Sequence, residues 1–126
     1  MQKSKKATLV YAEDSKSIST VIKSKLASEG YEVHHFEDGG GVVDAVLKLK
    51  PAVVLLDNDM PVKSGLTILK EIKKNPDIKN IPVIFLTNSK DSQSVVSCLQ
   101  LGVSDYIVKD PLAISEIVTR VRKYIQ

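Results

Sequence analysis

Acidic side chains stand directly after two apolar runs of this sequence. Residues 52–57 read AVVLLD, so five apolar residues lead into Asp57. Residues 7–12 read ATLVYA, and Glu13 and Asp14 follow at once. A carboxylate at the end of a rigid, buried segment is well placed to attack an electrophile or to bind a cation.

A threonine and a lysine end two further apolar runs: IPVIFLT ends at Thr87, and VSDYIVK ends at Lys109. If the runs are neighbouring parallel strands, their carboxyl ends meet at one edge of a sheet, where Glu13, Asp14 and Asp57 converge. Like charges a few Å apart repel strongly, so such a cluster needs a bound cation. Oxygen ligands without His or Cys favour Mg²⁺, or Mn²⁺, at this place.

The chemistry that these residue types predict is phosphoryl transfer. Asp57 is the expected nucleophile, because its apolar run buries the strand in the middle of the sheet and presents Asp57 at a rigid end. The charge of Lys109 and the hydroxyl of Thr87 would neutralise the oxygens of a phosphoryl group bound beside the metal ion. Asp59 is expected to offer the metal its backbone carbonyl, while its carboxylate points elsewhere.

The elements that must position these residues follow from the alternation of apolar runs with amphipathic segments. Runs that are apolar at nearly every position are typical of strands covered on both faces. Five strand–helix pairs predict an α/β fold with a five-stranded parallel sheet between two helical layers. The expected strands are 7–12, 31–36, 52–57, 81–87 and 103–109, and the expected helices are 15–29, 41–50, 64–75, 91–101 and 111–125.

Local signals support the expected helices. In residues 15–29, apolar side chains that include Val21 and Ile22 recur at helical spacing, and Gly30 is placed to end the helix. Ser64 is the expected N-cap of the third helix.

The totals fit one soluble domain, since 126 residues with 43% hydrophobic and 26% charged side chains are ordinary globular values. Residues 1–6, with three lysines, are expected to be a flexible basic tail. A net charge of +3 is weak evidence for nucleic acid, so no direct nucleic-acid binding is expected.

Cys98 is the single cysteine, which excludes an internal disulfide and a thiolate metal cluster. Without a signal peptide or a membrane-length apolar run, we expect a cytoplasmic protein with no membrane insertion.

Taken in order, the motifs resemble those of response-regulator receiver domains, the phosphoacceptor modules of two-component signalling. The resemblance covers essentially the whole chain and implies a single receiver domain over residues 1–126, with the flavodoxin-like strand order 2-1-3-4-5. The matching stretches are LVYAEDS with the acidic pair Glu13 and Asp14, LLDNDMPVKSG with Asp57, FLTNS with Thr87, and DYIVK with Tyr106 and Lys109.

The resemblance implies a Mg²⁺-dependent reaction in which a histidine kinase or a histidine phosphotransfer protein gives its phosphoryl group to Asp57. Glu13, Asp14, Asp57 and the carbonyl of Asp59 would hold the metal. The chain would then be a phosphoacceptor with self-catalysed phosphorylation and dephosphorylation, and not an enzyme in the usual sense.

The resemblance also implies a switch. Thr87 would move towards the phosphoryl group, and Tyr106 would turn inward to fill the vacated space. The surface formed by the fourth helix, the fifth strand and the fifth helix would change, and a downstream protein or a fused output domain would bind it.

The sequence departs from the family pattern after Lys109. Members commonly have proline directly after the lysine, but here Asp110 precedes Pro111, and the two are expected to cap and begin the last helix. Asn88 stands where a small residue is frequent. In the family, the positions that Asp59 and Ser89 occupy here tune how long the phosphoryl group lasts.

Alternative functions are a pseudo-receiver, which would bind partners without phosphorylation, and a phosphatase with an aspartate nucleophile. The stretch DND fits the Asp-x-Asp of haloacid-dehalogenase-type phosphatases. A flavin site is a poor option, because the first loop is acidic where a phosphate cradle is needed. His34 and His35 face opposite ways on a strand, so they are expected to be structural or solvent-facing.

Overall fold

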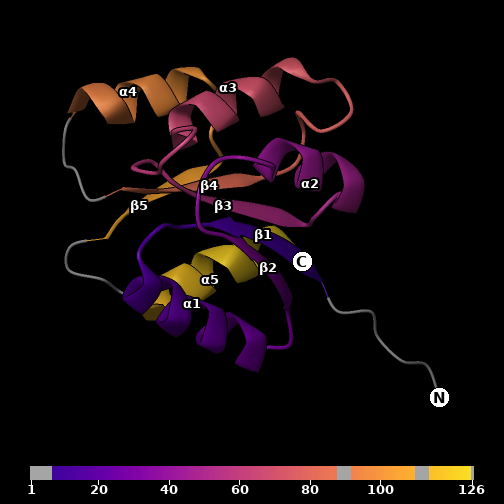
Figure 1. The fold of residues 1–126 in the computed structure, drawn as a ribbon, viewed down its shortest axis with the longest axis vertical. Helices are drawn as coiled ribbons and strands as arrows, with labels where there is room; N and C mark the ends of the chain where they lie inside the picture. Colours follow the sequence, from indigo (N-terminus) through magenta and orange to yellow (C-terminus); the bar gives the residue numbers. More distant parts are fainter. Residues whose placement is uncertain (1–6, 88–91, 110–113, 126) are drawn as a thin grey trace.

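The computed structural model describes residues 7–87, 92–109 and 114–125. Within these ranges strands and helices alternate along the chain, as the apolar runs predicted (Figure 1). The strands are β1 Thr8–Ala12, β2 Glu32–Phe36, β3 Val53–Asp57, β4 Val83–Thr87 and β5 Asp105–Val108. The helices are α1 Lys16–Ser28, α2 Val42–Leu49, α3 Gly65–Lys74, α4 Ser92–Gln100 and α5 Ile114–Ile125.

The strands form one parallel sheet in the order β2-β1-β3-β4-β5. Helices α1 and α5 cover one face, and α2, α3 and α4 cover the other (Figure 1). The prediction of a flavodoxin-like (βα)5 three-layer sandwich is therefore confirmed. Because β1 and β3 lie inside the sheet, the acids that follow them lie near the middle of its carboxyl edge.

The apolar strand runs are explained by burial on both faces. In β1, Leu9 and Tyr11 pack with α1 and α5, whereas Val10 and Ala12 pack with the helices on the opposite face. All four side chains are fully buried, and every residue of β3 is buried too. Alternate strand residues point to opposite faces, so a strand between two helical layers has no polar side.

The outer strands are less buried than the central ones, and β5 is also one residue shorter. The residues of β2 are half-buried or exposed, as expected at an edge. The strand predicted at 81–87 begins only at Val83, because Pro82 has no N–H to donate to the ladder. The strand predicted at 103–109 spans only Asp105–Val108. Four strands end at the predicted residue, and β5 ends one residue earlier than predicted, at Val108.

The helix ends follow the predicted signals, but the buried face of α1 differs from the prediction at one residue. The hydroxyl of Ser64 accepts a hydrogen bond from the Thr67 N–H at 3.2 Å, and Gly30 follows α1 with a φ of 94°. Val21, predicted to share the apolar stripe of α1, is instead 50% exposed. No helix in the described ranges has the length and the apolar character that crossing a membrane requires.

Candidate functional site

The pairing register of the central strands brings two of the predicted acids together. Tyr11 of β1 lies beside Leu55 of β3. Glu13 and Asp57 each follow two residues later, and side chains two apart on a strand face the same way. The two carboxylates therefore leave the sheet side by side, although 44 positions separate them in the sequence.

Strands β4 and β5 complete the same edge. Thr87 pairs with Val108, and the next residue, Lys109, donates its backbone N–H to the Thr87 carbonyl at 2.7 Å. The side chains of Thr87 and Lys109 are buried, each in a residue that is 4% exposed. A fully buried lysine is rare unless it is paired, so its partners are informative.

Lys109 lies between the two buried acids. Its ammonium Nζ donates to Glu13 Oε1 at 3.0 Å, to Glu13 Oε2 at 3.2 Å and to Asp57 Oδ1 at 3.0 Å. All three side chains are 3% exposed or less. Lys109 thus reaches the site even though proline does not follow it directly.

Asp57 is held in an environment that disfavours its charged form. Burial raises its pKa, and the charge of Glu13 raises it further, so that the pKa of Asp57 reaches about 7 against the lowering effect of Lys109. Burial pushes the pKa of Lys109 down, but its hydrogen bonds and charge pairing with Asp57 and Glu13 raise it above the ordinary value. The cluster therefore carries more negative charge than its single lysine balances, which favours a further cation.

Three of the predicted metal ligands lie close enough to hold one ion. Glu13, Asp14 and Asp57 each offer a carboxylate oxygen, and these oxygens all lie within 4.8 Å of one another. Glu13 and Asp57 are buried, whereas Asp14 is exposed and opens the cluster to solvent. An all-oxygen donor set with one open side fits Mg²⁺, which keeps several water ligands.

Asp14 is not the cap of the following helix. The hydroxyl of Ser15 takes that role and accepts the Ile18 N–H at 3.3 Å. The Ser15 N–H donates to Glu13 Oε2 at 3.2 Å, so the buried carboxylate accepts hydrogen bonds from Ser15 as well as from Lys109. The position of Asp14 at the turn thus has no structural explanation from capping.

Asn58 holds the loop between β3 and α3 against the site, a role that sequence reasoning missed. Its side-chain oxygen accepts the Leu66 N–H at 3.2 Å, and its carbonyl accepts the Gly65 N–H at 3.1 Å. A Cβ at Gly65 would overlap the carbonyl of Asp57, so this close approach requires glycine. Asp59, in the same loop, has an exposed side chain, and the role of its carbonyl as a ligand stays a prediction.

The two residues expected to act as a switch lie on neighbouring strands. Tyr106 of β5 pairs with Phe85 of β4, two residues before Thr87. It is half-buried and packs against the core that α2, α3 and α4 cover. Thr87 is more deeply buried. This arrangement is compatible with a coupled movement, which stays a prediction.

The contacts of His35 and Tyr11 beside Glu13 were also not predicted from the sequence. The His35 Nε2 donates to the Glu13 backbone carbonyl at 2.9 Å, because a carbonyl can only accept. The rings of His35 and Tyr11 contact each other with centroids 5.3 Å apart. The pairing of β1 with β2 places Tyr11 opposite His35, and the sequence by itself does not specify this register.

Several expectations fall outside the described residues. They concern Asp110 as an N-cap, Pro111 as the first residue of the last helix, and the effect of Asn88 and Ser89 on the site. The basic tail at residues 1–6 falls outside as well.

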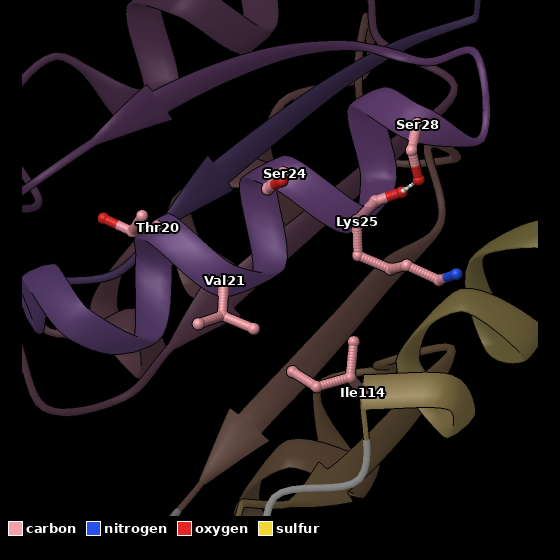
Figure 2. A pocket seen from close by; sticks show the side chains of 6 residues that line it. All are labelled: Thr20, Val21, Ser24, Lys25, Ser28 and Ile114. Atoms are coloured by element: carbon pink, nitrogen blue, oxygen red, sulfur yellow. Dashed lines mark hydrogen bonds between the residues drawn. The ribbon is translucent and has the colours of Figure 1, made fainter.

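A shallow groove of about 420 Å³ lies elsewhere, between α1 and α5 (Figure 2). Its floor is apolar where Val21 and Ile114 approach, and none of its lining residues is an acid. It therefore does not share the chemistry of the acidic cluster. It is lined by Thr20, Val21, Ser24, Lys25, Ser28 and Ile114.

Comparison with known proteins agrees with the geometry of the acidic edge. The family model of the response regulator receiver domain matches residues 9–122. The receiver domain of the Francisella response regulator 1452 is 28% identical, with a TM-score of 0.85, over 94% of this chain and 96% of that chain.

Two further solved structures are similar. The receiver domain of sensor histidine kinase PA1611 from Pseudomonas aeruginosa, with magnesium coordinated in its active site cleft, is 28% identical with a TM-score of 0.86, over 96% of this chain and 98% of that chain. The beryllofluoride-activated receiver domain of RstA from Klebsiella pneumoniae is 27% identical with a TM-score of 0.83, over 94% of this chain and 98% of that chain. The chain belongs to the response regulator receiver domain family of two-component signalling.

Proposed function

We propose that Asp57 accepts a phosphoryl group from the phosphohistidine of a histidine kinase or of a histidine phosphotransfer protein in the cytoplasm. The observation that carries the proposal is the position of Asp57, which ends a fully buried strand 3.0 Å from Lys109 Nζ and shares a cluster of acidic oxygens with Glu13 and Asp14. Members of this family are phosphoacceptors rather than classical enzymes.

The transfer breaks one bond and forms one. A carboxylate oxygen of Asp57 attacks the phosphorus atom, and an oxygen–phosphorus bond forms while the nitrogen–phosphorus bond of the phosphohistidine breaks. The leaving imidazole keeps the electron pair of the broken bond. The reaction needs little from the protein beyond in-line positioning and charge stabilisation.

Lys109 and Thr87 supply that stabilisation from the protein. The Lys109 ammonium already contacts Asp57, and after the transfer it would donate to a negatively charged phosphoryl oxygen. The hydroxyl of Thr87, on the adjacent strand, would donate to another oxygen and draw the strand end with it. Both side chains are buried where β4 and β5 end, so they already stand at the carboxyl edge of the sheet before a phosphoryl group arrives.

Glu13, Asp14 and Asp57, with the carbonyl of Asp59, would hold Mg²⁺ or Mn²⁺. The ion, when bound, supplies positive charge that neutralises phosphoryl oxygens during the transfer. The closeness of the three carboxylates supports this ligand set.

The output would be a change in the surface formed by α4, β5 and α5, which a downstream protein or a fused output domain binds. Val96 and Leu99 on α4 support a protein partner, because they are 49% and 56% exposed although they are apolar. Tyr106 lies on the neighbouring strand and is half-buried, and its inward turn would be part of this change.

Mass spectrometry after incubation with acetyl phosphate and Mg²⁺ tests the proposal. We expect the unmodified chain to gain the mass of one phosphoryl group, and Asp57→Asn to gain none, because an amide is a poor nucleophile. Asp77→Asn is the matched control and should leave the labelling unchanged. Asp77 is an exposed acid in the loop that leads into the amino end of β4, at the edge of the sheet opposite the site.

Labelling that persists in Asp57→Asn would move the acceptor elsewhere. If the unmodified chain is not labelled, and beryllofluoride with Mg²⁺ leaves its spectrum unchanged, the chain is a pseudo-receiver. Steady release of phosphate from a phosphate monoester would instead identify a phosphatase.

A further inference from the structure

The hydroxyl of Tyr11 is buried beside the acidic cluster with no hydrogen-bond partner among the described residues. Tyr11 is 0% exposed. Buried polar groups are nearly always hydrogen-bonded, because an unpaired one loses the hydrogen bonds that it made with water. A solitary buried hydroxyl at a reaction site therefore calls for an explanation.

The position of Tyr11 is set by the sheet and by its neighbour on β2. Tyr11 of β1 faces α1 and α5, and Glu13 follows it by two residues, so the two side chains leave the chain in the same direction. The ring of His35 packs against the Tyr11 ring, and the same histidine donates to the Glu13 backbone carbonyl. The hydroxyl is thus held near the Glu13 carboxylate, though short of the geometry of a hydrogen bond.

The Glu13 carboxylate accepts hydrogen bonds from two residues, and it shares one of them, Lys109, with Asp57. Lys109 donates to both of its oxygens, and the Ser15 N–H donates to one of them. Lys109 also donates to Asp57, which is the proposed phosphoacceptor. When Lys109 is drawn towards phosphoryl oxygens on Asp57, the buried Glu13 loses its main donor, at a cost in free energy.

We propose that Tyr11 is a positioning residue for phosphoryl transfer, whose hydroxyl donates to the Glu13 carboxylate when Lys109 turns to the phosphoryl group on Asp57. This inference rests on the proposed function. Tyr11 stabilises the state in which Lys109 has left Glu13, and it contributes nothing to the unmodified state, in which its hydroxyl is unpaired. A tyrosine that served only as packing would need its ring but not its hydroxyl.

The variant Tyr11→Phe separates these roles, because it keeps the ring that packs on His35 and removes the hydroxyl alone. We expect labelling by acetyl phosphate at saturating Mg²⁺ to slow about tenfold, the size of one hydrogen bond to a charged group. The melting temperature of the metal-free chain should stay the same or rise, since a buried unpaired hydroxyl is lost. Tyr31→Phe is the matched control, because Tyr31 packs against the same core without being part of the site.

A spectroscopic measurement reads the new hydrogen bond directly. The chain has four tyrosines and no tryptophan, so its near-ultraviolet absorbance reports on tyrosine hydroxyls. In a Tyr106→Phe background, adding beryllofluoride and Mg²⁺ should shift the tyrosine band. Tyr11→Phe should abolish that shift, and Tyr31→Phe should keep it.

The outcomes distinguish this inference from the proposed function. Labelling of Tyr11→Phe at the rate of the unmodified chain would refute the role of Tyr11 and leave Asp57 as acceptor. Slower labelling without a Tyr11 component in the absorbance shift would also refute it. An unmodified chain that is neither labelled nor shifted by beryllofluoride would refute both.

Discussion

At the scale of single residues, the site is a balance of buried charge. Two carboxylates, Glu13 and Asp57, share the one ammonium of Lys109, with every contact between 3.0 and 3.2 Å. The same lysine that screens the acids in the unmodified chain is the cation expected to meet the phosphoryl group. Its removal should therefore affect stability as well as chemistry.

Lys109→Met should lower the free energy of unfolding in metal-free buffer by about 3 kcal/mol, because it leaves two buried carboxylates without their cation. Urea denaturation measures the change. Lys63→Met is the control: it breaks an ion pair with Glu71 whose side chains are 33% and 41% exposed, and such pairs contribute about 1 kcal/mol or less. Equal effects of the two variants would contradict the importance of burial at this site.

The free energy of unfolding should change with pH because Asp57 titrates at a different pH in the folded and the unfolded chain. Its pKa is raised to about 7 in the folded chain, so between the unfolded pKa of about 3.9 and pH 7 the folded state binds more protons than the unfolded state. Stability in metal-free buffer must then fall as the pH rises through this window and level off above it.

Asp57→Asn removes this titration and should melt several degrees higher than the unmodified chain near pH 8, with a smaller gap near pH 5. Thermal melts across that range measure the gap. Asp77→Asn, at an exposed position, should follow the unmodified chain throughout. A gap that is constant with pH would show that Asp57 does not titrate there.

At the scale of elements, the loop between β3 and α3 is held by a few tight contacts and contains a strained residue. Val62 has a φ of 72°, in the left-handed region that β-branched residues avoid, and it is 79% exposed. The loop is closed by the hydrogen bonds of Asn58 and by the glycine contact at Gly65. The strain of Val62 is offset by these contacts on both sides of it.

Val62→Gly should raise the free energy of unfolding by about 1 kcal/mol, because relief of the left-handed strain exceeds the entropy that glycine adds to the unfolded chain. Urea denaturation measures it. Val21→Gly is the matched control, since Val21 is also an exposed valine but lies in regular helix, where glycine is destabilising. A loss of stability in both variants would contradict the strain at Val62.

At the scale of the whole molecule, the three layers turn separate strand ends into one site. The central strands β1 and β3 are buried by helices on both faces, so their ends cannot move apart without disturbing the core. Rigid strand ends keep the acidic oxygens within 4.8 Å of one another despite their repulsion. A dication bound there should stabilise the entire fold by mass action.

Mg²⁺ should raise the melting temperature of the unmodified chain by several degrees, since a concentration of one hundred times Kd adds about 2.7 kcal/mol. Asp14→Asn should lose most of this rise. Because Asp14 is exposed, the same substitution should change the metal-free melting temperature little. A full Mg²⁺ response in Asp14→Asn would place the ion elsewhere.

Much of the fold and of the site followed from the sequence by itself. Buried strands leave an unbroken apolar run, and the polar residue at the end of such a run stands out, as Asp57 and Thr87 do. Parallel strands then require these ends to meet at one edge. The convergence of Glu13, Asp14, Asp57 and Lys109 was accessible for these reasons, whereas the order of the strands followed from the resemblance to receiver domains.

Only the tertiary structure decided the contacts that depend on register and on side-chain reach. Local periodicity does not specify which residues of β1 and β2 lie opposite each other, so the contacts of His35 with Tyr11 and with Glu13 were not foreseen. Nor does it specify which acids a lysine reaches, and Lys109 contacts Glu13 as well as Asp57. Local sequence determines what each strand is, whereas the packing of distant segments determines which groups share a proton, a charge or an ion.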